Sequence, residues 1–235
     1  MADERLLSVS QVADRLHVSR ARVRQLVDQR ALHPRRVGHQ LVFEEDALRA
    51  VIRERPPGRP VSPELAWGIA LAAEGSKPSW LSPVQRSRAA KIVRESSPAA
   101  VYAKLARRAE IASYHSSERG LGIINQHDDS RPAGSSLAGK HAIDLLVSGV
   151  IERYVPRSEL HELVRLAPLL RNLSQPNVIL HVMDDSLWSN IKELDHIPPA
   201  AAASDLIEVG FLLDSDRWQR AGWDLLERSW PKRAA

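Results

Sequence analysis

The chain has 235 residues, a formal net charge of +4 and no cysteine. This length is enough for one large or two ordinary domains, and the lack of cysteine excludes disulfides, cysteine-ligated metals and cysteine nucleophiles. The first 59 residues hold twelve arginines and eight acids, so they carry the whole positive excess. A basic excess at one end of a chain indicates a nucleic-acid partner. A charged N-terminus and the lack of long apolar runs predict a cytoplasmic protein without a signal peptide.

A pair of short helices is predicted near the N-terminus. Ser8 and Gln11 form a capping box, which begins a helix over residues 9–16. Two residues then lead into a second helix over residues 19–30, whose N-cap is Ser19. Two helices joined by so short a turn form a helix-turn-helix, in which the second helix enters the major groove of DNA.

The second helix has one apolar and one basic face. Val23, Leu26 and Val27 follow the spacing of a buried stripe. Arginine and glutamine fall largely off that stripe, where they can donate to phosphate oxygens and guanine edges. From Arg15 to Val42 the sequence holds seven arginines and one acid.

A β-hairpin is predicted after this helix, with strands over residues 32–37 and 41–43 and a turn over residues 38–40. It forms the wing of a winged helix-turn-helix, and a third helix over residues 47–53 follows it. We expect Arg20, Arg22 and Gln25 to read bases, with Ala21 against a thymine methyl, and Arg24 and Gln29 to hold phosphates. The full set of expected DNA contacts is Ser19, Arg20, Ala21, Arg22, Arg24, Gln25, Gln29 and, on the wing, Arg35, Arg36, His39 and Gln40.

Three segments of this region resemble the excisionase/MerR-type winged helix-turn-helix. They are residues 7–13, 18–23 and 31–38, and the resemblance covers about the first quarter of the chain. The resemblance implies double-stranded DNA as the partner. Ala31 stands where that family usually has glycine before the wing, which makes a less favourable helix C-cap.

A proline-rich linker over residues 56–61 separates this domain, residues 1–55, from residues 62–235. The remainder alternates helical and strand patterns, which predicts an α+β, mainly helical fold with a small sheet covered by helices. Residues 62–100 are a candidate helical connecting subdomain. Expected strands are residues 109–115, 150–155 and 177–183, expected helices include residues 136–146, 158–170, 200–209 and 216–230, and residues 120–136 are expected to be turn-rich.

No catalytic or metal constellation emerges from the sequence. His127, Asp128 and Asp129 lie in a polar stretch without a second ligand cluster at metal spacing. Asp184 and Asp185 follow an apolar strand and could hold magnesium, but the helix pattern after them favours a role for Asp185 in the first turn of that helix. His141 reads as a packed histidine. We therefore expect that the protein is not an enzyme and binds no cofactor or metal.

The sequence also offers a second basic patch that could contact DNA. It consists of Arg86, Arg88, Lys91 and Arg94.

The region after the linker resembles the C-terminal half of AbiE-type (type IV) antitoxins. The matching segments are residues 107–115, 135–139, 151–155, 198–206 and 220–226. This resemblance implies an α+β domain joined to a winged helix, repression of the protein's own operon through promoter repeats, and a nucleotidyltransferase-like toxin as partner. The excisionase-like N-terminus departs from that family's usual winged helix.

The sequence thus predicts a DNA-binding repressor, the autoregulating antitoxin of a toxin–antitoxin operon, acting as a homodimer or cooperatively on DNA. Two alternatives stay open. One is a one-component regulator whose second domain binds a small molecule. The other is a recombination accessory protein or enzyme that uses the winged helix only to find DNA.

Overall fold

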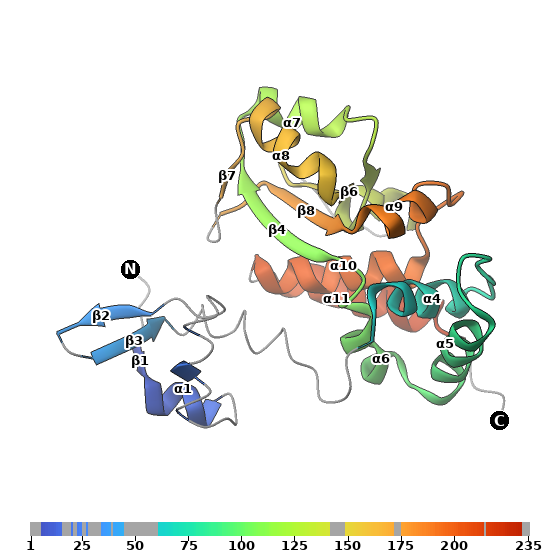
Figure 1. Cartoon of the computed structure of the whole chain (residues 1–235), viewed down its shortest axis with the longest axis horizontal. Helices are drawn as coiled ribbons and strands as arrows, with labels where there is room; N and C mark the ends of the chain where they lie inside the picture. Colours follow the sequence, from blue (N-terminus) through green and yellow to red (C-terminus); the bar gives the residue numbers. More distant parts are fainter. Residues whose placement is uncertain are drawn as a thin grey trace. The chain divides into compact units, whose positions relative to one another are not determined.

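The computed structural model of the chain describes residues 6–15, 20, 23–24, 27, 34–38, 40–44, 61–141, 149–171, 175–213 and 215–231. The chain divides into two compact units, Met1–Gly58 and Arg59–Ala235. The division falls within the proline-rich segment of the sequence. Figure 1 shows the elements of each unit.

The first unit contains a three-stranded antiparallel sheet in the order β1-β3-β2. Strands β2 (Arg35–Val37) and β3 (Gln40–Glu44) form the predicted hairpin, in which Val37 pairs with Gln40. Gly38 in the turn has a φ of 60°, a conformation that suits the tight turns of hairpins. The sequence reading missed β1 (Leu6–Ser8), which pairs with the outer side of β3.

Helix α1 (Val9–Arg15) follows β1 directly and begins with the predicted capping box. The Ser8 amide donates to Gln11 Oε1 at 2.8 Å, and the Gln11 amide donates to Ser8 Oγ at 3.4 Å. The small core of this unit contains Leu7, Val12, Ala13, Val23 and Phe43. It therefore joins the sheet to the first and second helices, and Val23 lies in it as the apolar spacing of the second helix predicts.

The second unit begins with three helices whose N-termini have the same sequence pattern, a serine followed by a proline. Each has proline in its first turn and a preceding serine, whose hydroxyl accepts from the backbone amide three residues on. These helices are α4 (Pro63–Ala73, capped by Ser62), α5 (Pro83–Glu95, capped by Ser82) and α6 (Pro98–Leu105, capped by Ser97).

A five-stranded sheet in the order β5-β6-β8-β4-β7 forms the centre of the second unit. The central pair, β6 and β8, is parallel, and the other pairs are antiparallel. The strands are β4 (Glu110–His115), β5 (Arg131–Pro132), β6 (Ile151–Pro156), β7 (Leu170–Arg171) and β8 (Val178–Met183). Parallel pairing requires a crossover, which α8 (Arg157–Leu166) provides between β6 and β8.

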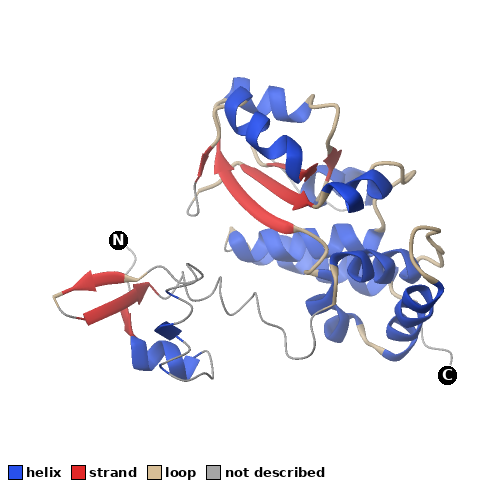
Figure 2. Ribbon diagram, in the orientation of Figure 1, coloured by secondary structure: helices blue, strands red, loops and turns tan. Residues whose placement is uncertain are grey.

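Helices cover both faces of this sheet (Figures 1 and 2). Helices α7 (Glu118–Asn125) and α8 pack on one face over an apolar cluster that includes Val155 and Leu180. On the other face, α10 (Pro199–Leu212) and α11 (Asp216–Ser229) share a larger cluster with the helices α4 to α6. The fold is α+β and mainly helical.

Two local predictions differ from the structure. Helix α7 overlaps the beginning of the stretch expected to be turn-rich; Ser117 caps it and Ile124 anchors its short apolar face. A 3-10 helix over Gly134–His141 stands where the sequence predicts an α-helix from residue 136, and residues 142–148 lie outside the described part. A short helix, α9 (Asp185–Ile191), follows β8. Among the described residues, no helix has both the length and the apolar character of a membrane span.

Glycine allows α10 and α11 to approach closely. A Cβ atom on Gly222 of α11 would lie 2.8 Å from the carbonyl oxygen of Ala203 and 2.8 Å from the amide nitrogen of Ile207, both on α10. A Cβ atom on Gly210 of α10 would lie 2.6 Å from the amide nitrogen of Gln219. Because the obstructing atoms are backbone, they cannot move aside without separating the two helices.

We expect Gly222→Ala to lower the free energy of unfolding by about 1–3 kcal/mol, because it overpacks the helix crossing. Urea unfolding followed by circular dichroism measures this. The matched control is Gly122→Ala in α7, where a Cβ atom meets nothing within 4 Å. It should be neutral or stabilise by up to about 1 kcal/mol through helix propensity. Equal effects of the two variants would contradict the close crossing.

Candidate functional site

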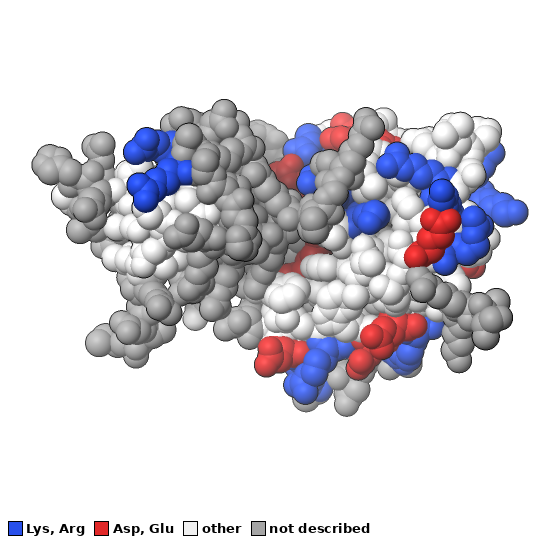
Figure 3. Space-filling view, turned by 90° about the horizontal axis from the view of Figure 1, so that it is seen from below, with Lys and Arg blue, Asp and Glu red and all other residues white. Residues whose placement is uncertain are grey.

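The described positions of the predicted recognition helix have the two faces that DNA binding requires. Residues 20, 23, 24 and 27 are helical. Val23 is fully buried in the small core, whereas Arg20 and Arg24 are exposed. Among the described residues, neither arginine forms an ion pair. Figure 3 shows Lys and Arg side chains of the first unit in blue.

Three more of the predicted DNA-contact residues lie on the two strands of the wing. Arg35 and Arg36 lie on β2, opposite Val42 and Leu41, and Gln40 begins β3. The remaining predicted contacts, Ser19, Ala21, Arg22, Gln25, Gln29 and His39, and the third helix over 47–53, lie outside the described residues.

The second basic patch consists of one structural arginine and three cations that form no ion pair with the part of the chain that the structure describes. Arg86 is half-buried, and its Nη1 donates to the carbonyl oxygen of Leu81 at 2.5 Å and to that of Pro78 at 3.5 Å. It therefore fixes the loop between α4 and α5. Arg88, Lys91 and Arg94 are exposed on α5.

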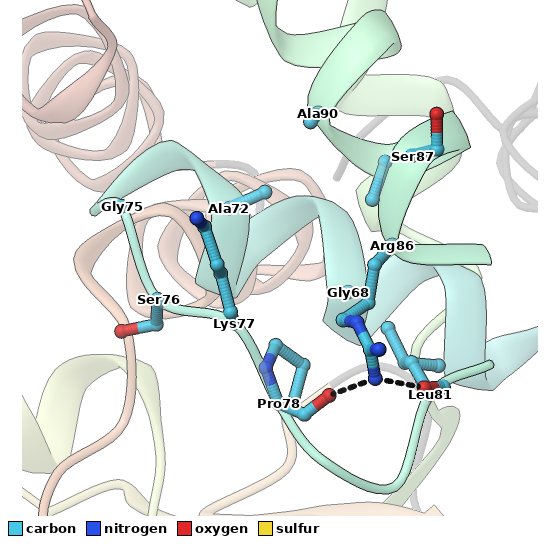
Figure 4. A pocket seen from close by; sticks show the side chains of 11 residues that line it. Gly68, Ala72, Gly75, Ser76, Lys77, Pro78, Leu81, Arg86, Ser87 and Ala90 are labelled. Atoms are coloured by element: carbon cyan, nitrogen blue, oxygen red, sulfur yellow. Dashed lines mark hydrogen bonds between the residues drawn. The ribbon is translucent and has the colours of Figure 1, made fainter. Parts of the chain in front are cut away.

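A groove of about 370 Å³ lies between α4 and α5 beside this loop (Figure 4). Its walls are mostly small residues, including Gly68, Ala72 and Ala90. In the guanidinium of Arg86, Nη1 is engaged by the carbonyl oxygens of Pro78 and Leu81 in the loop. The groove lacks the convergent polar groups that orient a small-molecule ligand.

The densest polar cluster of the second unit is centred on Arg108, whose side chain is 1% exposed. Its guanidinium joins elements that are far apart in sequence and is bonded on every side. It donates to the Leu105 carbonyl oxygen at 2.9 Å, Ser204 Oγ at 2.9 Å, Tyr154 Oη at 3.0 Å, Glu208 Oε2 at 2.7 Å and Asp205 Oδ1. Burial lowers the pKa of Arg108, but Asp205 and Glu208 outweigh it and raise the pKa well above its ordinary value.

A second set of contacts extends the cluster to Glu152 and His181, both fully buried on neighbouring strands. His181 Nε2 lies 2.7 Å from Glu152 Oε1, and its Nδ1 lies 3.6 Å from Asp205 Oδ1 without a hydrogen bond. Burial alone lowers the pKa of His181. The charge of Asp205 and the contact with Glu152 outweigh burial, so the pKa is raised and favours imidazolium.

Glu152, His181 and Asp205 could in principle ligate a metal, since one ligand atom from each lies within 4.8 Å of the others. Their carboxylate oxygens are already occupied by protein donors. Asp205 accepts from the Gly134 amide at 3.0 Å and from Tyr154 Oη at 2.7 Å, and Glu152 accepts from the Ser135 amide at 2.8 Å. A cation would displace these bonds and would lie close to the guanidinium of Arg108. We interpret the cluster as a structural charge network.

The other candidate ligands serve local structure. Asp184 pairs with Arg157 at 3.4 Å, and Asp185 accepts from the Ser158 amide at 3.1 Å. Asp129 accepts from Trp188 Nε1 at 2.9 Å, and His127 Nε2 lies 3.4 Å from Glu159. The side chain of His141 lies outside the described part of the chain.

The sequence analysis missed the Arg108 network, although its members carry a recognisable signal. Glu152 and His181 interrupt apolar strands, and Asp205 follows a run of four alanines. Charged residues are almost never fully buried unless they are paired. Charges inside apolar runs therefore predict a paired interior cluster.

We expect Arg108→Met to lower the free energy of unfolding by about 3–5 kcal/mol, because it leaves buried carboxylates without a counter-charge. Denaturant unfolding measures the loss. The control is Arg165→Met, which breaks an exposed pair with Glu162 and should cost no more than about 1 kcal/mol. A loss as small as that of the control would contradict the role of Arg108.

The raised pKa of His181 predicts a pH-dependent stability. Its imidazolium stabilises the fold fully below the unfolded-state pKa of about 6.5, and this contribution is lost as pH rises through the folded-state pKa. Denaturant unfolding should therefore show a fall in stability above about pH 6.5 that His181→Gln removes. His161→Gln, at an exposed position of α8, should retain the fall. An NMR titration that leaves the His181 ring neutral throughout would contradict the assignment.

Comparison with known proteins identifies the first unit. A family model described as a helix-turn-helix domain matches residues 6–56. No curated protein and no solved structure matches the chain. The match covers both predicted helices and the wing, and a helix-turn-helix is a DNA-binding motif. The N-terminal unit is thus a helix-turn-helix domain, and it indicates that DNA is the partner.

Proposed function

We propose that the chain is a sequence-specific transcription repressor that binds operator DNA through the helix over residues 19–30 and the wing. The observation that carries the proposal is the sorting of that helix into a buried Val23 and exposed Arg20 and Arg24. This is the arrangement of a helix held on one side by a small core and free on the other to enter a major groove. The proposal assigns the chain no catalytic step.

The test uses the DNA upstream of the protein's own coding sequence, with binding measured by fluorescence anisotropy. Arg22→Ala should weaken binding by about 1–3 kcal/mol and relax base preference, because it removes a base contact. Arg36→Ala should weaken all duplexes alike, because it removes a phosphate contact. Arg119→Ala, at an exposed position of α7, is the control and should bind as the wild type does. Wild-type affinity of Arg22→Ala would overturn the helix assignment.

We further propose that the repressor is the antitoxin of a two-gene pair whose partner is a nucleotidyltransferase-like toxin. This rests on the resemblance of five segments of the second unit to AbiE-type antitoxins. Expression of the neighbouring reading frame alone should arrest growth, and co-expression of this chain should restore it. Growth unaffected by that reading frame, or arrest that the chain does not relieve, would overturn the antitoxin role and leave DNA binding untouched.

A further inference from the structure

We propose that three cations of α5 form a second DNA-contact surface that binds phosphates regardless of base sequence. The surface, here the α5 cation strip, consists of Arg88, Lys91 and Arg94. The inference rests on the proposed function, since it takes duplex DNA as the ligand of the whole chain.

The strip lies in the most one-sided basic segment of the second unit. Glu95 is the only acid between Gly75 and Ala109. The same segment holds eight basic residues, one of which, Arg108, is neutralised in the interior. They are Lys77, Arg86, Arg88, Lys91, Arg94, Lys104, Arg107 and Arg108. The surface of this segment is therefore strongly positive.

The helix geometry arranges the three cations as one continuous strip. Successive members are three residues apart, so Arg88 and Arg94 are separated by about 9 Å along the axis. Each step turns the side chain by only about 60°, which keeps all three on the solvent side. Ala89 and Val93 anchor the opposite side of α5 in the core. Figure 3 shows several Lys and Arg side chains, with acidic side chains beside them, at the right-hand end of the second unit, where α5 lies in Figure 1.

Arg88, Lys91 and Arg94 have no acidic partner among the described residues, whereas several other exposed cations of the second unit are paired. Arg157 pairs with Glu110 at 2.8 Å, Arg165 with Glu162 at 3.3 Å, and Lys192 with Asp129 at 4.0 Å. Unpaired cations on a rigid helix keep their full charge available for an external anion. A row of such charges suits a regularly charged polymer better than a single small anion.

Duplex DNA is the anionic polymer that the rest of the chain indicates, because the first unit is a helix-turn-helix domain. Phosphate contacts add affinity and carry no base information. Each one releases counterions and steepens the fall of affinity with salt by about 0.9 in the log–log slope. The strip would thus add affinity while the recognition helix supplies the sequence preference.

The test is the full chain with Arg88→Gln, Lys91→Gln and Arg94→Gln combined. Binding is measured by anisotropy between about 50 and 200 mM salt, on upstream DNA and on an unrelated duplex of equal length. Affinity should fall by the same factor on both duplexes, and the slope should decrease by up to about 2.7. The matched control combines Arg119→Gln, Arg165→Gln and Lys192→Gln, which removes the same charge from α7, α8 and the C-cap of α9. It should leave both quantities at the wild-type level.

Equal binding by the two triple variants would overturn the strip, while the helix-turn-helix function would stand if Arg22→Ala still loses affinity. The proposal would also be overturned if the variant without the strip cations bound duplex DNA as the wild type does but lost binding to single-stranded RNA. That result would assign the strip to RNA. If the wild-type chain binds no duplex at low salt, the proposed function itself fails. Unfolding curves that match between the two variants confirm that neither effect arises from misfolding.

Discussion

The second unit depends on one buried guanidinium. Arg108 bonds to Tyr154 on β6 and to Ser204, Asp205 and Glu208 on α10, so it ties the sheet to the helices that cover one of its faces. Glu152 and His181 continue the network to β8. A buried charge destabilises the fold unless it is fully paired. Truncation of one partner therefore destabilises the fold, because it leaves the remaining buried charges without compensation. The network therefore restricts how α10 can sit on the sheet.

The positive charges of the chain fall into two groups with different roles. Arg108 is neutralised in the interior, and Arg157 and Arg165 are paired at the surface. Arg20 and Arg24 on the helix-turn-helix face solvent without an ion pair among the described residues. The first group stabilises the fold, and the second group is available to an anionic partner. We therefore expect cations such as Arg20 and Arg24, and not the paired ones, to bind the anionic partner.

Local signals in the sequence predict much of this fold. Capping boxes and serine–proline starts locate α1, α4 and α5, and apolar runs locate β6 and β8. Long-range pairing was harder to predict: β1 is only three residues long, and its pairing with β3 depends on contacts distant in sequence. Helix α7 was missed because glycines at 120 and 122 weaken its helical pattern. The partners of Arg108 on α10 lie about a hundred residues away along the chain, so this pairing could not be matched from the sequence.

The central claim is that arginines of the N-terminal domain bind the phosphates and bases of duplex DNA. The most direct measurement is the affinity of the full chain for the DNA upstream of its own coding sequence as salt rises from about 50 to about 200 mM. The account predicts tight binding at low salt, a preference over unrelated DNA, and a linear fall of log affinity with log salt at about 0.9 per phosphate contact. Binding that is absent at low salt, or that does not change with salt, would contradict it.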